Sequence, residues 1–334
     1  MADQIVALPG TLSASTVIDF ANRLSIRDGS RCIFDFTNVT WCEPFGLLYL
    51  GRVLRTIKSR HPELTLVART VENDFRGYAS HLGFFRYAGF PRGNRPGEAS
   101  GSGTYVAIQR WRVSEIQEEA GYNPYGSLVD NKAHEICSIM LQAEKGPAFE
   151  YTQYALRELL RNAIEHSDGD EVLFLAQYWP RKGASEIAII DDGIGLRRSL
   201  GRNSKLSVTN DVSALQLAMA PGISRVTKRS SRDGEWRNSG FGLYMTSNLC
   251  ASNGEFRLVS GKAGIRLQAG KRSRFEARFK GTGVQMTLAI PKNKSLNDFL
   301  QELRLKARTL VRQGGLVSEP SASSLTASKR GKHL

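Results

Sequence analysis

Glu158 and Asn162 are spaced four residues apart, and both side chains are of types that take part in chemistry. On a helix, residues i and i+4 share a face, so this carboxylate and this amide would point the same way. An asparagine oxygen suits a Mg²⁺ ion shared with phosphates, because that ion prefers oxygen ligands. The neighbouring carboxylate could orient or deprotonate a nucleophile. The same spacing also fits an amphipathic helix with two polar residues facing water, so the pair alone does not decide.

A second candidate is Asp191-Asp192-Gly193-Ile194-Gly195, directly after the apolar strand-like run 186–190. A carboxylate at a strand end can accept a hydrogen bond from an amino group. The two glycines permit positive φ angles and let the backbone approach a ligand closely. An ordinary strand-ending turn is the alternative, since Asp-Gly is a frequent turn sequence.

Two further glycine motifs follow. Ser239-Gly240-Phe241-Gly242-Leu243 opens a helix predicted over 241–252, and a helix N-terminus offers free N–H groups and the positive dipole end to a phosphate. Gly281-Thr282-Gly283-Val284 precedes the last strand-like run. A hinge before a core helix and a hairpin turn are the respective alternatives.

The periodicity of apolar residues predicts elements that could position these motifs. Residues 130–166 read as helix almost throughout, with a break at Gly146-Pro147. The segment 196–239 mixes Gly, Ser, Asn and basic residues around a short helical piece at 212–219. Strands are predicted at 171–178, 186–190, 255–259, 274–279 and 284–290.

The order of the four motifs resembles that of the GHKL, or Bergerat-fold, ATP-binding domains. These occur in histidine kinases, type II topoisomerases, Hsp90-like chaperones, MutL-like proteins and anti-sigma-factor kinases. The resemblance covers roughly residues 126–293 and implies an α/β two-layer sandwich with ATP and Mg²⁺ as cofactors. Under it, Asp191 would read the adenine amino group, Asn162 would hold Mg²⁺, and Glu158 matches the carboxylate that acts as a base in the hydrolysing or serine-phosphorylating branches.

The resemblance also assigns the remaining nucleotide-binding positions. The family has a threonine just before the final strand, and this position falls on Thr282 or on Val284, depending on how the last turn is counted. Residues 196–239 would form a mobile lid whose basic side chains could close on the triphosphate. The implied nucleotide-binding residues are Gly193, Gly195, Gly240, Gly242, Leu243 and Thr282, and the lid cations are Arg225, Lys228, Arg229 and Arg232.

His134 is followed by Glu135, which superficially resembles the phosphoacceptor box of histidine kinases. It precedes Asn162 by too few residues for a complete helical hairpin and a first strand, so a phosphoacceptor role is not favoured. His166 is a candidate phosphate contact, although a polar residue at a helix end is the more frequent case.

The first 92 residues alternate strand-like and helix-like runs, and this order is typical of an α/β domain. The sequence from Cys32 to Ile57 resembles a STAS domain, the fold of anti-sigma-factor antagonists. Regulatory members carry a phosphorylated Ser in the segment that here reads Glu43-Pro44-Phe45-Gly46. Since Pro44 has no hydroxyl, a docking or dimerising module is expected instead of a phosphorylation switch.

The composition points to a cytoplasmic protein without a secretory signal or a membrane span. The four cysteines, Cys32, Cys42, Cys137 and Cys250, stand far apart and are expected to be reduced, mostly buried thiols. The formal net charge is +14, and residues 196–280 alone carry a net of +12. Such asymmetry implies a polyanion nearby or, equally, a solvated basic surface.

The expected organisation has four parts: a STAS-like α/β domain at 1–92, a linker and connecting strand at 93–125, a GHKL-type ATP-binding domain at 126–293, and a basic helix with a disordered tail at 294–334. The expected function is regulation: closure of the lid on Mg-ATP would drive partner binding, ATP hydrolysis or Ser/Thr phosphotransfer. A nucleic-acid-associated ATPase and a non-catalytic scaffold are the alternatives. A regulatory protein is the expected partner, nucleic acid is less favoured, and a homodimer is compatible with both resemblances.

Overall fold

The computed structural model describes residues 3–27, 31–120, 125–141, 143–223 and 242–289, with 298, 301–302, 305–306 and 309. The N-terminal unit is built on a parallel three-stranded sheet of order β1-β3-β5, as the alternation of strands and helices predicts. A short parallel pair, β2 and β4, lies beside it. The elements are β1 Gln4–Ala7, β2 Thr11–Leu12, α1 Ala14–Arg23, β3 Arg31–Asp35, β4 Trp41–Cys42, α2 Pro44–Arg60, β5 Thr65–Arg69, α3 Asp74–Leu82 and α4 Phe84–Tyr87.

Local sequence explains where the two long helices of this unit begin. Ser13 and Thr16 form a reciprocal capping box at the start of α1. Pro44 occupies the first turn of α2, where the missing N–H costs no hydrogen bond. The residue at which a STAS-like switch would carry a hydroxyl is therefore the proline that begins α2.

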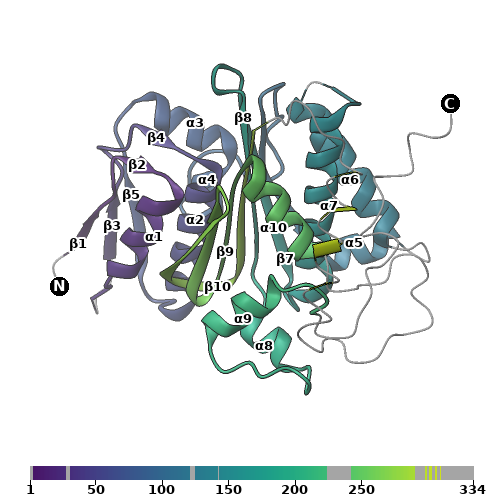
Figure 1. Ribbon diagram of the computed structural model, residues 1–334. Coiled ribbons are helices and arrows are strands. Elements are labelled where there is room, and N and C mark those ends of the chain that lie inside the picture. The colour runs from purple at the N-terminus through teal and green to yellow at the C-terminus, as the bar shows by residue number, and fades with distance from the viewer. Residues whose placement is uncertain are drawn as a thin grey trace.

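The second unit is an antiparallel five-stranded sheet of order β6-β7-β8-β10-β9. Helices α6, α7 and α10 lie on one side of this sheet, and α8 and α9 lie at one end (Figure 1). The elements are β6 Tyr105–Arg112, α5 Val113–Ala120, α6 Tyr125–Leu141, α7 Pro147–His166, β7 Glu171–Trp179, a 3₁₀ turn Pro180–Lys182, β8 Ala184–Asp191, α8 Gly195–Gly201, α9 Asp211–Ala218, α10 Gly242–Asn253, β9 Gly254–Gln268 and β10 Lys271–Ala289.

Both faces of the five-stranded sheet are buried. On β7, Phe174 packs into the core under α6, α7 and α10, whereas Leu173 and Leu175 pack into the core of the N-terminal unit. Helices α1 and α2 lie on this second face (Figure 1). The expected two-layer arrangement therefore describes one side only, and the N-terminal unit adds a further helical layer on the other.

Two segments differ from the sequence-based expectation. The strand expected as part of a connection at 93–125 is β6, which pairs with β7 and forms an edge of the sheet. The runs expected at 255–259, 274–279 and 284–290 belong to one long hairpin of β9 and β10, with register shifts between Glu276 and Thr282. Its turn, Ala269-Gly270, has two positive φ angles of 47° and 73°, as tight hairpins require.

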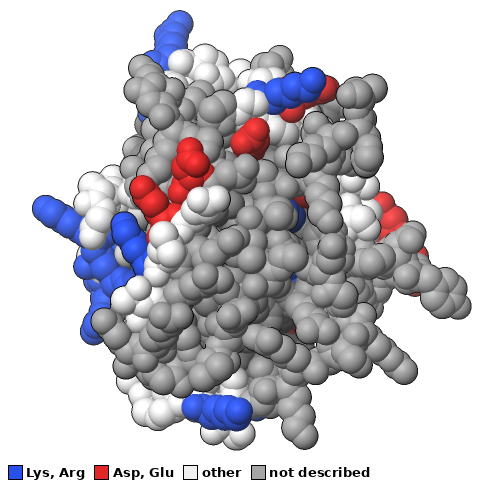
Figure 2. Space-filling view, turned by 45° about the vertical axis from the view of Figure 1, so that its right-hand side comes forward, with Lys and Arg blue, Asp and Glu red and all other residues white. Residues whose placement is uncertain are grey.

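The four cysteines are buried free thiols, as expected. Within the described ranges, no helix has the length and apolarity needed to cross a bilayer. Most of the segment 294–334, where a basic helix and a tail are expected, lies outside the described residues. On the face in Figure 2, the described lysines and arginines cluster at the left and also lie at the top, the upper right and the bottom, and described acidic residues lie next to them and at the right edge.

Candidate functional site

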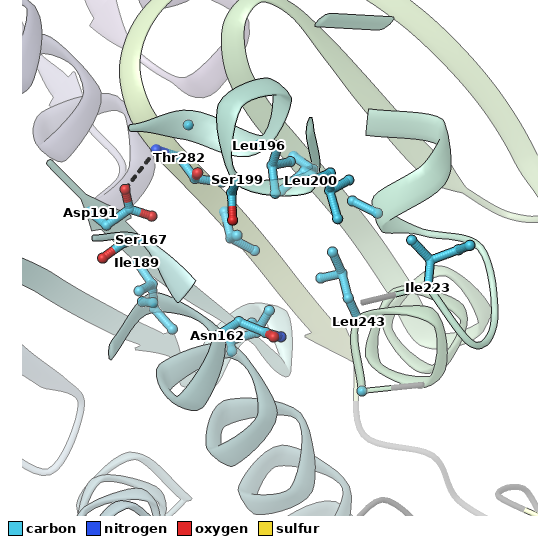
Figure 3. Close-up of a pocket in the computed structure, with 17 residues that line it drawn as sticks. Asn162, Ser167, Ile189, Asp191, Leu196, Ser199, Leu200, Ile223, Leu243 and Thr282 are labelled. Atoms are coloured by element: carbon cyan, nitrogen blue, oxygen red, sulfur yellow. Dashed lines mark hydrogen bonds between the residues drawn. The ribbon is translucent and has the colours of Figure 1, made fainter. Parts of the chain in front are cut away.

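One cavity brings together most of the residues that the motifs indicated. It lies between α7, the end of β8, the interior of β10, helix α8 and the start of α10 (Figure 3). The cavity encloses about 880 Å³ including its open mouth. Six predicted residues line it, namely Asn162, Asp191, Gly195, Gly242, Leu243 and Thr282, and so does the alternative Val284.

Asp191 forms the polar end of this cavity. It is the last residue of β8, and its side chain is buried with 5% exposure. Its Oδ1 accepts hydrogen bonds from the backbone N–H groups of Gly193, at 2.9 Å, and Thr282, at 3.0 Å. Two chain segments, one after β8 and one within β10, therefore hold this carboxyl group in place.

Burial raises the pKa of Asp191 to about 7, although the two backbone N–H groups oppose this shift. The nearby Asp192 adds a smaller upward contribution to the pKa. Burial also raises the pKa of Glu186, on the same strand, to about 7. Three groups around Glu186 lower its pKa, namely the backbone N–H of Phe45 and the side chains of Gln285 and Arg257. The side chain of Glu43 raises this pKa.

We expect the nucleotide-free protein to be less stable at pH 8 than at pH 6. Asp191 and Glu186 bind their protons more tightly in the folded state than in the unfolded chain. The free energy of unfolding therefore falls as the pH rises from about 4 to about 7 and levels off above. Between pH 6 and pH 8 the loss is about 1.4 kcal/mol per carboxyl group. Urea unfolding of the wild type and Glu186→Gln at both values measures it, and an unchanged pH dependence in the variant would contradict the assignment.

The glycines around Asp191 permit close backbone approaches. Gly281 has a φ of 99°, and a Cβ there would clash with the backbone oxygen of Asp191. A Cβ at Gly193 would clash with the backbone of Ser167. Gly193 does not line the cavity, so it makes room for the chain and not directly for a ligand. Gly195, with a φ of 77°, lines the cavity and begins α8.

Asn162 lies across the cavity from Asp191, on α7 (Figure 3). Its amide nitrogen is buried and has no hydrogen-bond partner among the described residues. An unpartnered buried amide in a cavity is a group that a ligand would satisfy. The two ends of an amide are interchangeable by rotation, so the oxygen can equally point into the cavity. Within the described ranges, no cluster of three or more His, Cys, Asp or Glu side chains could hold a metal ion. A Mg²⁺ ion here would therefore depend on Asn162, phosphate oxygens and water, which is a donor set that suits this ion.

Most of the remaining side chains that line the cavity are apolar, and they come from β8, α8, α10 and the segment after α9. They are suited to a flat ring, because a ring can lie between aliphatic side chains while its edge reaches a carboxylate. Leu196, Leu200, Ile189, Ile223 and Leu243 are seen around the cavity in Figure 3.

Glu158 lies near the cavity but does not line it. It is buried with 4% exposure, and Arg157 Nη2 donates to its Oε1 at 3.3 Å. A Cβ at Gly242 would clash with Glu158 Oε2, so the carboxylate lies directly beside the start of α10. Glu158 is therefore close to the helix N-terminus that opens on the cavity.

Several residues of the site were not indicated by the sequence. Ser260 Oγ accepts from the N–H of Leu196 at 2.9 Å and donates to the backbone oxygen of Gly281 at 3.0 Å, so it joins α8 to β10. Ser167 and Ser199 line the cavity. Isolated serines carry no recognisable spacing, and the only available signal was the proximity of Ser167 to Asn162 in sequence.

The segment 196–239, expected to be a mobile lid, contains most of α8 and all of α9 in its first part, and both helices contact β9. The candidate phosphate contacts Arg225, Lys228, Arg229 and Arg232 lie outside the described residues, as does Gly240. His134 packs edge-on against Phe149 at a ring distance of 4.9 Å, far along the chain from the cavity-lining part of α7. For His166, the structure describes the backbone at the end of α7 only.

A helix-borne amide, a strand-end carboxyl group and glycine-rich segments around one apolar cavity form a candidate small-molecule site in an α/β domain. Residues 150–292 match the family model of histidine kinase-, DNA gyrase B- and HSP90-like ATPases. The match covers less than half of the chain and supports a GHKL ATPase domain at these residues. No curated protein matches the chain. The resemblance of the first 92 residues to a STAS domain stays a prediction.

Proposed function

We propose that this protein binds ATP together with Mg²⁺ and that nucleotide occupancy regulates a protein partner, either by binding or by phosphate transfer to Ser or Thr. The observation that carries the proposal is the shared cavity of Asp191 and Asn162, which come from different elements and both line it. The family match at residues 150–292 supports the same assignment.

The cavity residues suggest how the nucleotide would be held. The ionised carboxylate of Asp191 accepts a hydrogen bond from an exocyclic amino group, and the leucines and isoleucines of the walls cover the ring. The amide of Asn162 reaches a Mg²⁺ ion, and the N-terminus of the 12-residue helix α10 offers N–H groups to phosphates. When bound, ATP supplies the phosphoryl group for transfer or hydrolysis.

The two alternative functions are a nucleic-acid-associated ATPase and a non-catalytic scaffold. Binding to single-stranded nucleic acid generally uses exposed aromatic rings for base stacking. Phe256 and Phe279 are buried in the two cores, and Phe275 packs against the second core, so none of them forms such a platform. A scaffold that binds no nucleotide would keep the fold but show no response to ATP.

A thermal melt with and without Mg-ATP tests the proposal. At an ATP concentration 100 times its Kd, binding stabilises the folded state by about 2.7 kcal/mol. For a chain of this size, the Tm should rise by roughly 5–10 °C. Chelation of Mg²⁺ should reduce this shift, and GTP at the same concentration should give a smaller one. If the Tm does not move, the protein is a scaffold and the proposal is wrong.

A further inference from the structure

Helix α2 of the N-terminal unit contacts the back of the nucleotide cavity through side chains one turn apart. Tyr49 and Arg52 lie at i and i+3, so they share one face of the helix. The Tyr49 ring stacks on Phe279 of β10 at a centroid distance of 4.8 Å. Its hydroxyl lies 3.3 Å from both the nitrogen and the oxygen of the Arg278 backbone. This face of α2 therefore follows β10 toward Gly281 and Thr282.

Arg52 joins the two segments that hold Asp191. Its Nε donates to the backbone oxygen of Lys280 at 3.1 Å, and its Nη2 donates to the backbone oxygen of Asp192 at 3.3 Å. Asp192 directly follows Asp191, and Lys280 lies two residues before Thr282, whose N–H binds the Asp191 carboxyl. One guanidinium group thus fixes the separation of these two segments behind the cavity.

The Arg52 side chain is well suited to this task. Only 9% of the residue is exposed, and no carboxylate partner is found for it within the described residues. A guanidinium group is planar and holds its donors in a rigid fork, so its two acceptors are fixed relative to each other. Without this donor, the part-buried carbonyl groups of Lys280 and Asp192 lose a hydrogen bond, which favours a shift of the two segments.

We propose that Arg52 is a positioning residue through which the N-terminal unit sets the geometry of the base-recognition end of the nucleotide cavity. The inference rests on the proposed nucleotide binding and extends it: recognition of the base depends on a residue outside the matched ATPase segment. A partner that displaces α2 would thereby change which nucleotide the cavity prefers.

The test is the preference for ATP over GTP, expressed as the Kd for GTP divided by the Kd for ATP. Both Kd values are measured by competition against a fluorescent ATP analogue. GTP carries a carbonyl oxygen where adenine has its amino group, so the ratio reports how well Asp191 is placed. Arg52→Ala should lower the ratio about tenfold or more, equivalent to about 1.4 kcal/mol. A general loosening of the fold would weaken both nucleotides alike and leave the ratio unchanged.

Arg55→Ala is the matched control, because it removes the same charge one turn further along α2. Arg55 is 3.6 Å from Glu171 and does not line the cavity. The control should keep the wild-type ratio. If Arg52→Ala does not fold, Arg52→Gln, which keeps one side-chain donor group, is judged by the same criterion. A folded Arg52 variant with the wild-type ratio overturns the inference alone, whereas a wild type that binds no nucleotide overturns the proposed function first.

Discussion

Asp191→Asn is expected to abolish the stabilisation by Mg-ATP while making the nucleotide-free protein more stable above pH 7. The new amide keeps one oxygen for the N–H groups of Gly193 and Thr282. It also places an NH₂ group where the carboxylate offers its second oxygen, so it would face the adenine amino group with a donor. We expect the affinity for ATP to fall on the order of 100-fold, or about 2.7 kcal/mol. Thermal melts with and without Mg-ATP at pH 8 measure both effects.

The two effects have opposite signs, which separates this prediction from simple damage to the fold. The raised pKa of about 7 means that ionising Asp191 costs the folded state free energy at pH 8. A neutral amide removes this cost, so the Tm without nucleotide should rise. A variant that still responds to Mg-ATP like the wild type would show that Asp191 does not recognise the base.

Six of the residues that line the cavity could be predicted, because each belongs to a motif that is recognisable from the order of residues along the chain. Asn162 is recognisable from its spacing to Glu158, and Asp191 and Gly195 from their place after an apolar strand. Leu243 is recognisable because it comes directly after the glycines that precede a helix. The structure brings these residues into one cavity with Thr282, although they are far apart along the chain. Their roles toward ATP remain predictions until binding is measured.

The contribution of the N-terminal unit could not be predicted from the sequence. Arg52 lies in a helix whose apolar positions are evident, but nothing in the spacing shows that its guanidinium meets Asp192 and Lys280. The same holds for Glu186, whose carboxyl accepts from the N–H of Phe45 in the first turn of α2 at 2.9 Å. Such contacts depend on the packing of two units against each other, and they connect residues more than a hundred positions apart.

The second face of the five-stranded sheet packs against the N-terminal unit. A sheet whose two faces are both apolar must be covered on both sides, and Leu173, Leu175 and Ile190 supply the second apolar face. Helix α2 covers it together with α1 and at the same time reaches the segment after β8 and the segment around Lys280 within β10. Helix α2 therefore both packs on the sheet and holds the segments that position Asp191.

Glu158→Gln is expected to keep the stabilisation by Mg-ATP and to lower turnover by roughly 10²–10⁴-fold, the usual contribution of a general base. The glutamine has nearly the same shape, so it preserves the contact with Gly242 at the start of α10. It can still accept from Arg157 but cannot take a proton from water or an acceptor hydroxyl. Phosphate release and phosphorylation of candidate partners, measured beside the thermal melt, separate the two effects.

Glu165→Gln is the matched control, since Glu165 lies further along α7 and its carboxylate is 3.0 Å from Arg161. It should leave both the melt and the turnover near the wild-type values. Equal turnover for wild type and Glu158→Gln would rule out Glu158 as the base. A wild type that binds Mg-ATP without any turnover would leave binding alone as the regulatory event. In that case Glu158 has a structural role beside the start of α10, and Arg157 of the same helix α7 is its ion-pair partner.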